Sequence, residues 1–219
     1  MASIGYFGKY ARFTTVDKNE AGAFMGPDNI VGDYYTIKDI YTNGERQTWI
    51  VNAWDIKMGL LDEETADQID LNTAKGLETV ALLSYVAYSQ IKEEGIYWGE
   101  VAIISYDPQY EKAFKNFLEK LRRKIASGVR PDLNLGEKAL QELVSKNGNY
   151  LPSGRVPYPT LGKGEAFVKK ERTTTEILVN QAREGNKGCY FLSYVFLFIV
   201  FALIAFGVYT SGILNFLFT

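Results

Sequence analysis

The stretch YYTIKDIYTNGERQTWIVNAWDI, residues 34–56, carries the strongest local fold signal in this sequence. Two runs rich in β-branched and aromatic residues, Tyr34–Tyr41 and Arg46–Trp54, flank the dipeptide Asn43-Gly44. Asn-Gly between such runs favours a two-residue turn, because both central residues of that turn need a positive φ. The stretch therefore predicts a β-hairpin.

Four further elements are predicted downstream of the hairpin. IYWGEVAIISY, residues 96–106, is typical of a buried strand. Asp107-Pro108 then marks a helix start, with Asp as the N-cap and Pro at the first helical position, and an apolar stripe continues to Ile125. Another helix is expected over about 133–146. Residues 73–93 also show apolar residues at a helical spacing, so a helix is predicted there.

The predicted fold class is α+β: a small soluble domain with a β-hairpin, a buried strand and about three helices, plus one C-terminal transmembrane helix. Changes in composition along the chain suggest the organisation. The expected parts are an extended aromatic N-terminal arm (1–33), the α+β domain (34–150), a Pro/Gly-rich linker (151–173), a juxtamembrane helix (174–187), the transmembrane helix (188–212) and a short apolar tail (213–219).

The C-terminal stretch GCYFLSYVFLFIVFALIAFGVYTSG, residues 188–212, predicts a membrane span. It has no charge from Cys189 to Tyr209, and a helix of that length covers about 30 Å, the thickness of a bilayer's hydrocarbon core. The sequence thus predicts a tail-anchored, single-pass protein. The anchor residues expected in or beside the membrane are Tyr190, Tyr194, Phe196, Phe198, Phe201, Phe206, Gly207, Tyr209 and Ser211.

Charge predicts the orientation of that anchor. Residues 1–154 carry 17 basic and 22 acidic side chains, a net charge of −5, whereas residues 155–187 carry 7 and 4, a net charge of +3. Positive charge on one flank places that flank on the cytoplasmic side, or its stromal or matrix equivalent, with the C-terminus across the membrane. The basic residues expected beside the membrane are Lys169, Lys170, Arg172, Arg183 and Lys187.

Composition excludes several kinds of chemistry. The chain has no histidine and one cysteine, Cys189. Ser-His-Asp catalysis, Cys-His catalysis and Cys-rich metal sites are therefore excluded. The carboxylates at Asp62, Glu63, Glu64, Asp67 and Asp70 lack the spacing of a calcium loop and are interpreted as helix-capping residues. No catalytic, metal or cofactor residue is predicted, and no cofactor or nucleic acid is expected.

Aromatic residues are the remaining candidates for contact with a partner. Tyr6, Phe7, Tyr10 and Phe13 lie in the N-terminal arm, which is expected to pack either on its own domain or across a partner subunit. Trp49, Trp54 and Trp98 fall on predicted strands, and one or two of them are candidate binding anchors, although core positions are the commoner use.

Two main functional hypotheses follow. The first is a non-catalytic accessory, tethering or scaffold subunit of a larger membrane protein complex, with photosynthetic and respiratory membranes as candidates and with the lipid bilayer and other subunits as partners. The alternative is a membrane-attached enzyme or small-ligand-binding domain that uses a pocket in the α+β body. A third hypothesis, a fusion or trafficking protein, is less favoured because no heptad-patterned helix precedes the apolar segment.

Overall fold

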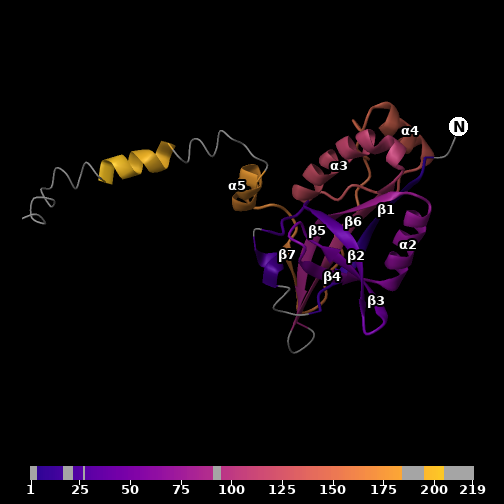
Figure 1. Cartoon of the computed structure of the whole chain (residues 1–219), viewed down its shortest axis with the longest axis horizontal. Coiled ribbons are helices and arrows are strands. Elements are labelled where there is room, and N and C mark those ends of the chain that lie inside the picture. Colours follow the sequence, from indigo (N-terminus) through magenta and orange to yellow (C-terminus); the bar gives the residue numbers. More distant parts are fainter. Residues whose placement is uncertain (1–3, 17–21, 27, 91–94, 184–194, 205–219) are drawn as a thin grey trace, which may run out of the picture. The chain divides into compact units, whose positions relative to one another are not determined.

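The computed structural model describes residues 4–16, 22–26, 28–90, 95–183 and 195–204 and divides into two compact units, Met1–Arg172 and Thr173–Thr219 (Figure 1). The second unit contains α5 (Thr174–Arg183) and a helix over 195–204. The first unit contains, in order, β1 (Tyr6–Thr14), η1 (Gly22–Met25), β2 (Tyr34–Thr42), β3 (Glu45–Val51), β4 (Lys57–Leu61), α2 (Glu63–Ala74), β5 (Glu78–Ser89), β6 (Ile96–Tyr106), η2 (Pro108–Tyr110), α3 (Glu111–Ala126), α4 (Glu137–Ser145) and β7 (Glu165–Lys169).

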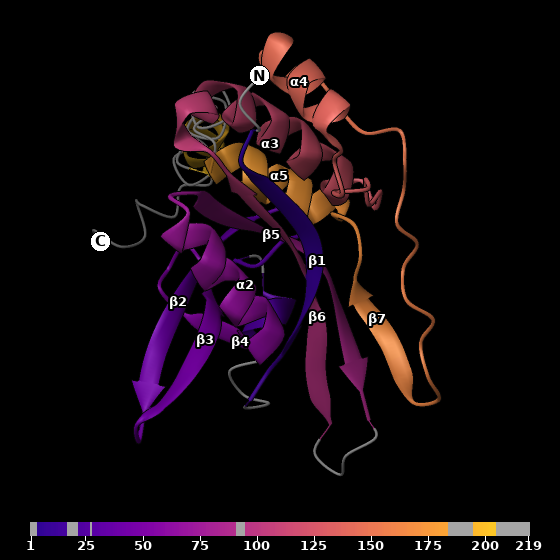
Figure 2. The ribbon, with the colours of Figure 1, turned by 90° about the vertical axis from the view of Figure 1, so that its right-hand side faces the viewer.

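Six of the strands form a closed antiparallel barrel. Their order is β2-β3-β4-β1-β6-β5, and the pairing of β2 with β5 through Tyr34–Leu82 and Tyr35–Ala81 closes the ring. Strand β5 divides one edge between two partners, because β7 pairs farther along it with Val86–Ser89. The predicted α+β fold is therefore wrong: the domain is a closed six-stranded β-barrel with a few helices around it (Figure 2).

The local signals for the hairpin and for β6 are confirmed. Asn43 and Gly44 have φ values of 54° and 83°, and the strands pair from Thr42–Glu45 to Thr36–Val51. The second strand of the hairpin ends at Val51, three residues earlier than predicted. Strand β6 covers the predicted range, Ile96–Tyr106.

The helix predicted over residues 73–93 is wrong, because most of that range forms strand β5. Ala81, Leu83 and Val86 point into the barrel, while Leu82 points outward beneath α3. When both faces of a strand are buried, the polar–apolar alternation that identifies a strand disappears. The apolar residues that matched a helical spacing are part of this doubly buried run.

Side chains fill the barrel interior. Phe13, Ile50, Leu83 and Ile103 are buried there, and Phe24 of η1 stacks on Phe13 with ring centroids 5.3 Å apart. Helix α2 also contributes Ile69 to this cluster. The interior is thus a core packed with side chains, as in other small barrels.

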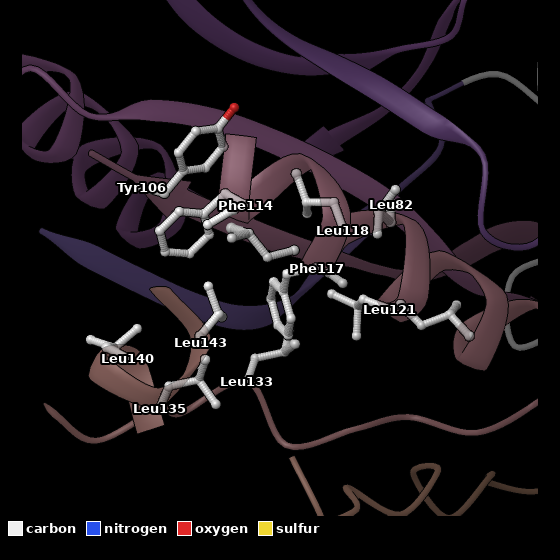
Figure 3. Close-up of a cluster of buried hydrophobic side chains, with 14 of the residues drawn as sticks. Leu82, Tyr106, Phe114, Phe117, Leu118, Leu121, Leu133, Leu135, Leu140 and Leu143 are labelled. Atoms are coloured by element: carbon white, nitrogen blue, oxygen red, sulfur yellow. The ribbon is translucent and has the colours of Figure 1, made fainter. Parts of the chain in front are cut away.

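A second core lies between the outer face of the barrel and helices α3 and α4 (Figure 3). The predicted apolar stripe of α3 is confirmed: Phe114, Phe117 and Leu121 are fully buried against Leu82 of β5. Helix α4 adds Leu143 to the same cluster. These two cores, one inside and one outside the barrel, hold the barrel strands in place.

The structure contradicts the predicted membrane anchor. The helix over 195–204 contains Phe196, Phe198 and Phe201, whose side chains are exposed. Nowhere in the described part of the chain is a helix both long and apolar enough to cross a bilayer, which requires about 20 residues. The single-pass topology and the sidedness inferred from it are therefore withdrawn. The other predicted anchor residues lie outside the described residues: Tyr190, Tyr194, Phe206, Gly207, Tyr209 and Ser211.

Candidate protein-binding surface

The three tryptophans occupy different environments. Trp49 on β3 and Trp98 on β6 are only 6% and 4% exposed, so both are core residues. Trp54 is 61% exposed and lies in the turn between β3 and β4, although the sequence predicted a strand there. Of the three candidate anchors, only Trp54 presents its ring to the outside.

Hydrogen bonds that one buried side chain accepts fix the turn that carries Trp54. The Asn52 Oδ1 atom accepts hydrogen bonds from the backbone N–H groups of Trp54 and Ile56, both at 3.0 Å. The Asn52 backbone N–H also donates to the Ile56 carbonyl at 3.0 Å. Asp55 adopts a φ of 63°, a conformation that Asn and Asp tolerate better than most residues. Residues 52–56 are called the Trp54 turn below.

The base of the Trp54 turn is tied to the interior of the barrel domain. Asn52 donates from Nδ2 to Asn29 Oδ1 at 3.1 Å, and the Tyr35 hydroxyl donates to the same oxygen at 2.7 Å. Asn29 in turn donates to the Ala23 carbonyl at 2.9 Å. Because these groups are buried, the network is costly to break and holds the turn in one conformation.

The surroundings of Trp54 combine apolar surface with charge. Ile56 is exposed in the same turn, and Asp55 forms an ion pair with Lys38 of β2 at 2.5 Å. An exposed aromatic ring on a rigid support with charged neighbours is typical of a binding hot spot, which has an apolar centre and a polar rim. This arrangement offers contact area for a partner.

The predicted carboxylate cluster caps helix α2 and pairs with two cations, Lys9 through Glu64 and Arg46 through Asp67 and Asp70. Asp62 is the N-cap and accepts a hydrogen bond from the Thr65 N–H at 2.7 Å, which confirms its interpretation as a capping residue. Asp67 and Asp70 face Arg46 of β3, with oxygen–nitrogen distances of 3.8 and 2.5 Å. Hydrogen bonds to Asp39 and Asp70 raise the pKa of Arg46, so its guanidinium remains a fixed cation.

A second polar cluster lies in the barrel wall around Arg130. Arg130 is 3% exposed, forms an ion pair with Glu100 of β6, and donates to the Pro157 carbonyl at 2.7 Å. Its guanidinium carbon lies 4.3 Å from the centre of the Tyr10 ring and 5.2 Å from that of Tyr158. These contacts attach the segment before and after α4 to the outer face of the barrel.

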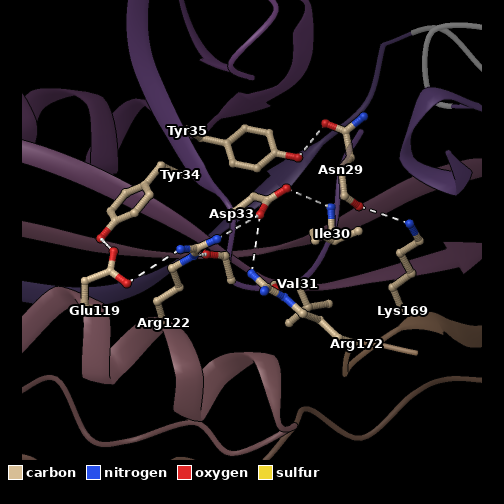
Figure 4. A network of polar contacts seen from close by, with 11 residues as sticks. Asn29, Ile30, Val31, Asp33, Tyr34, Tyr35, Glu119, Arg122, Lys169 and Arg172 are labelled. Atoms are coloured by element: carbon tan, nitrogen blue, oxygen red, sulfur yellow. Dashed lines mark hydrogen bonds and ion pairs between the residues drawn. The ribbon is translucent and has the colours of Figure 1, made fainter. Parts of the chain in front are cut away.

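Figure 4 shows a third cluster, centred on Asp33. The Asp33 carboxylate lies 3.4 Å from Arg172 Nη2 and 3.9 Å from Arg122 Nη2. Arg172 Nε also donates to the Val31 carbonyl at 2.6 Å, and Lys169 Nζ donates to the carbonyls of Gly26 and Asn29. The cluster holds the segment that precedes β2 against α3 and against β7 with the residues that follow it.

The predicted juxtamembrane basic residues therefore have varied positions. Lys169 and Arg172 make the internal contacts just described, and Lys170 is exposed while its carbonyl accepts a hydrogen bond from Tyr158. Arg183 is the last residue of α5, and Lys187 lies outside the described residues. Part of the positive charge that suggested a membrane flank therefore comes from Lys169 and Arg172, which attach β7 and the residues after it to the barrel domain.

The aromatic residues of the N-terminal arm form part of strand β1. Phe7 and Phe13 belong to the interior cluster of the barrel. Tyr6 and Tyr10 point to the outer face and donate hydrogen bonds to the carbonyls of Leu133 and Pro131, at 2.9 and 3.0 Å. The structure thus packs all four candidate partner contacts within their own domain.

The displaced tyrosine pKa values have a structural origin. Burial, reinforced by Tyr10 and Asp132, raises the pKa of Tyr6 far above its ordinary value. Burial also raises that of Tyr85, and the neighbouring Glu100 adds to the effect. A phenol held neutral in this way is a poor base or nucleophile, so these tyrosines do not indicate a catalytic site.

Comparison with known protein families, with curated proteins and with solved structures finds no match for this chain.

Proposed function

We propose that this chain is a non-catalytic accessory or scaffold subunit of a larger protein complex and that it contacts its partner through the Trp54 turn. One observation carries the proposal: a tryptophan 61% exposed on a turn whose backbone is fixed by the buried Asn52. Exposing so large an apolar ring to water is unfavourable, and a rigid support lowers the entropy lost when it becomes buried in a partner.

The packed barrel interior also supports a binding role over a container role. Ligand-holding barrels need an open lumen, whereas Phe13, Phe24 and Ile69 occupy this one. The charged side chains in the wall and at the ends are bound to one another, as Arg130 is to Glu100 and Arg46 to Asp70. Such pairs hold the domain together, and the rest of its surface is available for contact with a partner.

The proposal is tested with Trp54→Ala in a tagged full-length chain, purified in its native complex under mild conditions. Tyr41→Ala is the matched control, because Tyr41 is 71% exposed on β2 and lies outside the turn. Loss of a hot-spot tryptophan costs about 2 kcal/mol or more, which is about a 30-fold weaker affinity. We expect Trp54→Ala to lose the co-purifying partner and Tyr41→Ala to retain it at fixed stoichiometry.

Two results would contradict this function. One is a wild-type chain that migrates as a free monomer on native gels. The other is a Trp54→Ala variant that retains its partner as well as the control does. Both variants are expected to unfold within about 0.5 kcal/mol of the wild type, since each changes an exposed side chain. A thermal melt therefore verifies that any loss of binding is local.

A further inference from the structure

Strand β3 has an incompletely paired edge. On one side it pairs with β2 along its whole length, from Glu45 to Val51. On the other side its register with β4 begins only at Trp49, because β4 ends at Leu61 and the chain turns into α2. Along Glu45–Thr48, no other strand in the described part of the chain covers this second edge.

The hairpin geometry indicates which backbone groups face that edge. A two-residue turn with positive φ at Asn43 and Gly44 is closed by a hydrogen-bonded pair, here Thr42 and Glu45. Backbone groups alternate in direction along a strand, so Glu45 and Gln47 bond to β2. Arg46 consequently directs its N–H and C=O groups toward the side that lacks a partner strand, whereas Thr48 lies beside the end of β4.

A concavity of about 590 Å³ lies beside this edge. The strand edge forms one wall and the first turns of α2 form the other, with the end of β4 between them. Its lining residues are Glu45, Arg46, Gln47, Thr48, Leu60, Leu61, Glu63, Ala66 and Asp67. The volume lies within the range typical of ligand sites, and the shape is a groove between a strand and a helix.

The charges around this groove favour a basic occupant. Glu45, Glu63 and Asp67 line it, while its one cation, Arg46, is already bound to Asp39 and Asp70. Among the described residues, neither Glu45 nor Glu63 forms an ion pair, and Asp67 is bound only by the shared Arg46 at 3.8 Å. The carboxylates therefore exceed the positive charge available to neutralise them.

We propose that this groove binds an extended, lysine- or arginine-rich segment of a partner protein as an added β-strand beside Glu45–Thr48. Strand addition satisfies the outward backbone groups of Arg46, and the carboxylates at the rim select basic side chains. Four residues of strand cover about 13 Å, so the site recognises a short segment. Trp54 does not line the groove, so peptide binding to the groove can be tested independently of partner binding at the Trp54 turn.

The test uses purified full-length protein and three synthetic peptides of eight residues. The first alternates lysine and valine, the second alternates glutamate and valine, and the third is the first with alternate backbone amides N-methylated. Binding is measured by calorimetry and located by amide hydrogen exchange. We expect the lysine peptide to bind and to slow exchange within residues 45–48, the glutamate peptide to bind at least 10-fold more weakly, and N-methylation to abolish binding.

Charge variants provide the matched comparison. Glu45→Gln with Glu63→Gln is expected to weaken the lysine peptide about three- to tenfold, since each exposed ion pair contributes little. Glu137→Gln with Glu142→Gln, which removes two carboxylates on α4 instead, leaves binding unchanged. The Trp54→Ala variant binds the peptide like the wild type, which separates this site from the proposed function.

Three results would overturn the inference. Equal binding of the N-methylated peptide would mean attraction between opposite charges without strand addition. Protection that falls outside residues 45–48 would place the peptide elsewhere. A concentration-dependent dimer that the lysine peptide does not dissociate would show that a second copy of the chain occupies the edge.

Discussion

Replacing Arg130 by methionine is expected to destabilise the barrel domain by about 3–5 kcal/mol. The side chain is 3% exposed and its ion-pair partner Glu100 is largely buried. Methionine has a similar length and fills most of the space, so little of the cost comes from a cavity. The change therefore isolates the loss of the charge.

The expected magnitude follows from what the substitution leaves behind. Removing one member of a buried ion pair costs about 3–5 kcal/mol, because the remaining charge is largely removed from water and has lost its partner. The lost hydrogen bond to the Pro157 carbonyl and the lost contact with the Tyr10 ring act in the same direction. These contributions overlap and are not summed. For a domain of this size, the loss corresponds to a fall in Tm of about 6–20 °C.

The assay is a double-mutant cycle measured by urea unfolding of the full-length chain. Glu100→Gln removes the carboxylate charge, and the pair Arg130→Met with Glu100→Gln removes both charges. We expect the double variant to be more stable than Arg130→Met alone, because the unpaired charge is gone. If Arg130→Met costs less than about 1 kcal/mol, or if the two single costs simply add, the buried pair does not hold the wall together as argued.

Three other changes test the barrel interior, the α2 cap and the buried tyrosines. Gly99→Ala places a Cβ atom 2.2 Å from the Tyr85 carbonyl oxygen and 2.7 Å from the Phe13 ring, so a cost of about 1–3 kcal/mol is expected in urea unfolding; Gly22→Ala, where no atom lies within 4 Å, is the control. Asp62→Ala removes the N-cap of α2 and should cost about 1 kcal/mol, with Asp62→Asn much milder. Burial, aided by the hydrogen bond to Glu78, raises the pKa of Tyr106 from 10.0 to about 12, so the unfolded chain loses this proton at lower pH than the folded chain. Stability from this group is therefore complete below pH 10 and falls as the pH rises to about 12, and Tyr106→Phe should flatten that part of the profile; an unchanged slope would contradict the assignment.

The elements that could be predicted from the sequence are those specified by adjacent residues. Asn43-Gly44 fixes a turn by its own backbone preferences, and Asp107-Pro108 begins a helical segment in the same local way. Helix α3 shows one buried face, so its period is visible in the sequence. In each case the physical cause lies within a few positions of the residues that reveal it.

Barrel closure depends on contacts that no local pattern encodes. Strand β1 pairs with β6, although the two strands are far apart in the sequence. Strand β5 divides one edge between β2 and β7. The burial of both faces of β5 removed its alternation and led to a helix prediction. The apolar C-terminal run predicted a membrane span from hydropathy alone, whereas the described helix there covers only 195–204.

The candidate surface was only partly visible in the sequence. Trp54 was grouped with the strand because aromatic residues favour strands. The signal that could have separated it is Asn52 followed by Asp55, since both residue types favour turns through side-chain hydrogen bonds to the backbone. The free edge of β3 could not be predicted, because it depends on where β4 ends relative to its neighbours.

The position of β1 has a consequence for synthesis of the chain. Tyr6 pairs with Tyr106 and Thr14 pairs with Trp98, so β1 is made about 100 residues before the strand that pairs with its whole length. At about 5–20 residues per second, that wait lasts about 5–20 s. Throughout this interval a strand rich in tyrosine and phenylalanine lacks β6 and the helices that later cover it, and its earlier neighbour β4 pairs only with Phe13 and Thr14. The nascent chain thus presents this aromatic strand before its full-length partner exists, and a chaperone that shields β1 during that interval would protect the pairing with β6 that barrel closure needs.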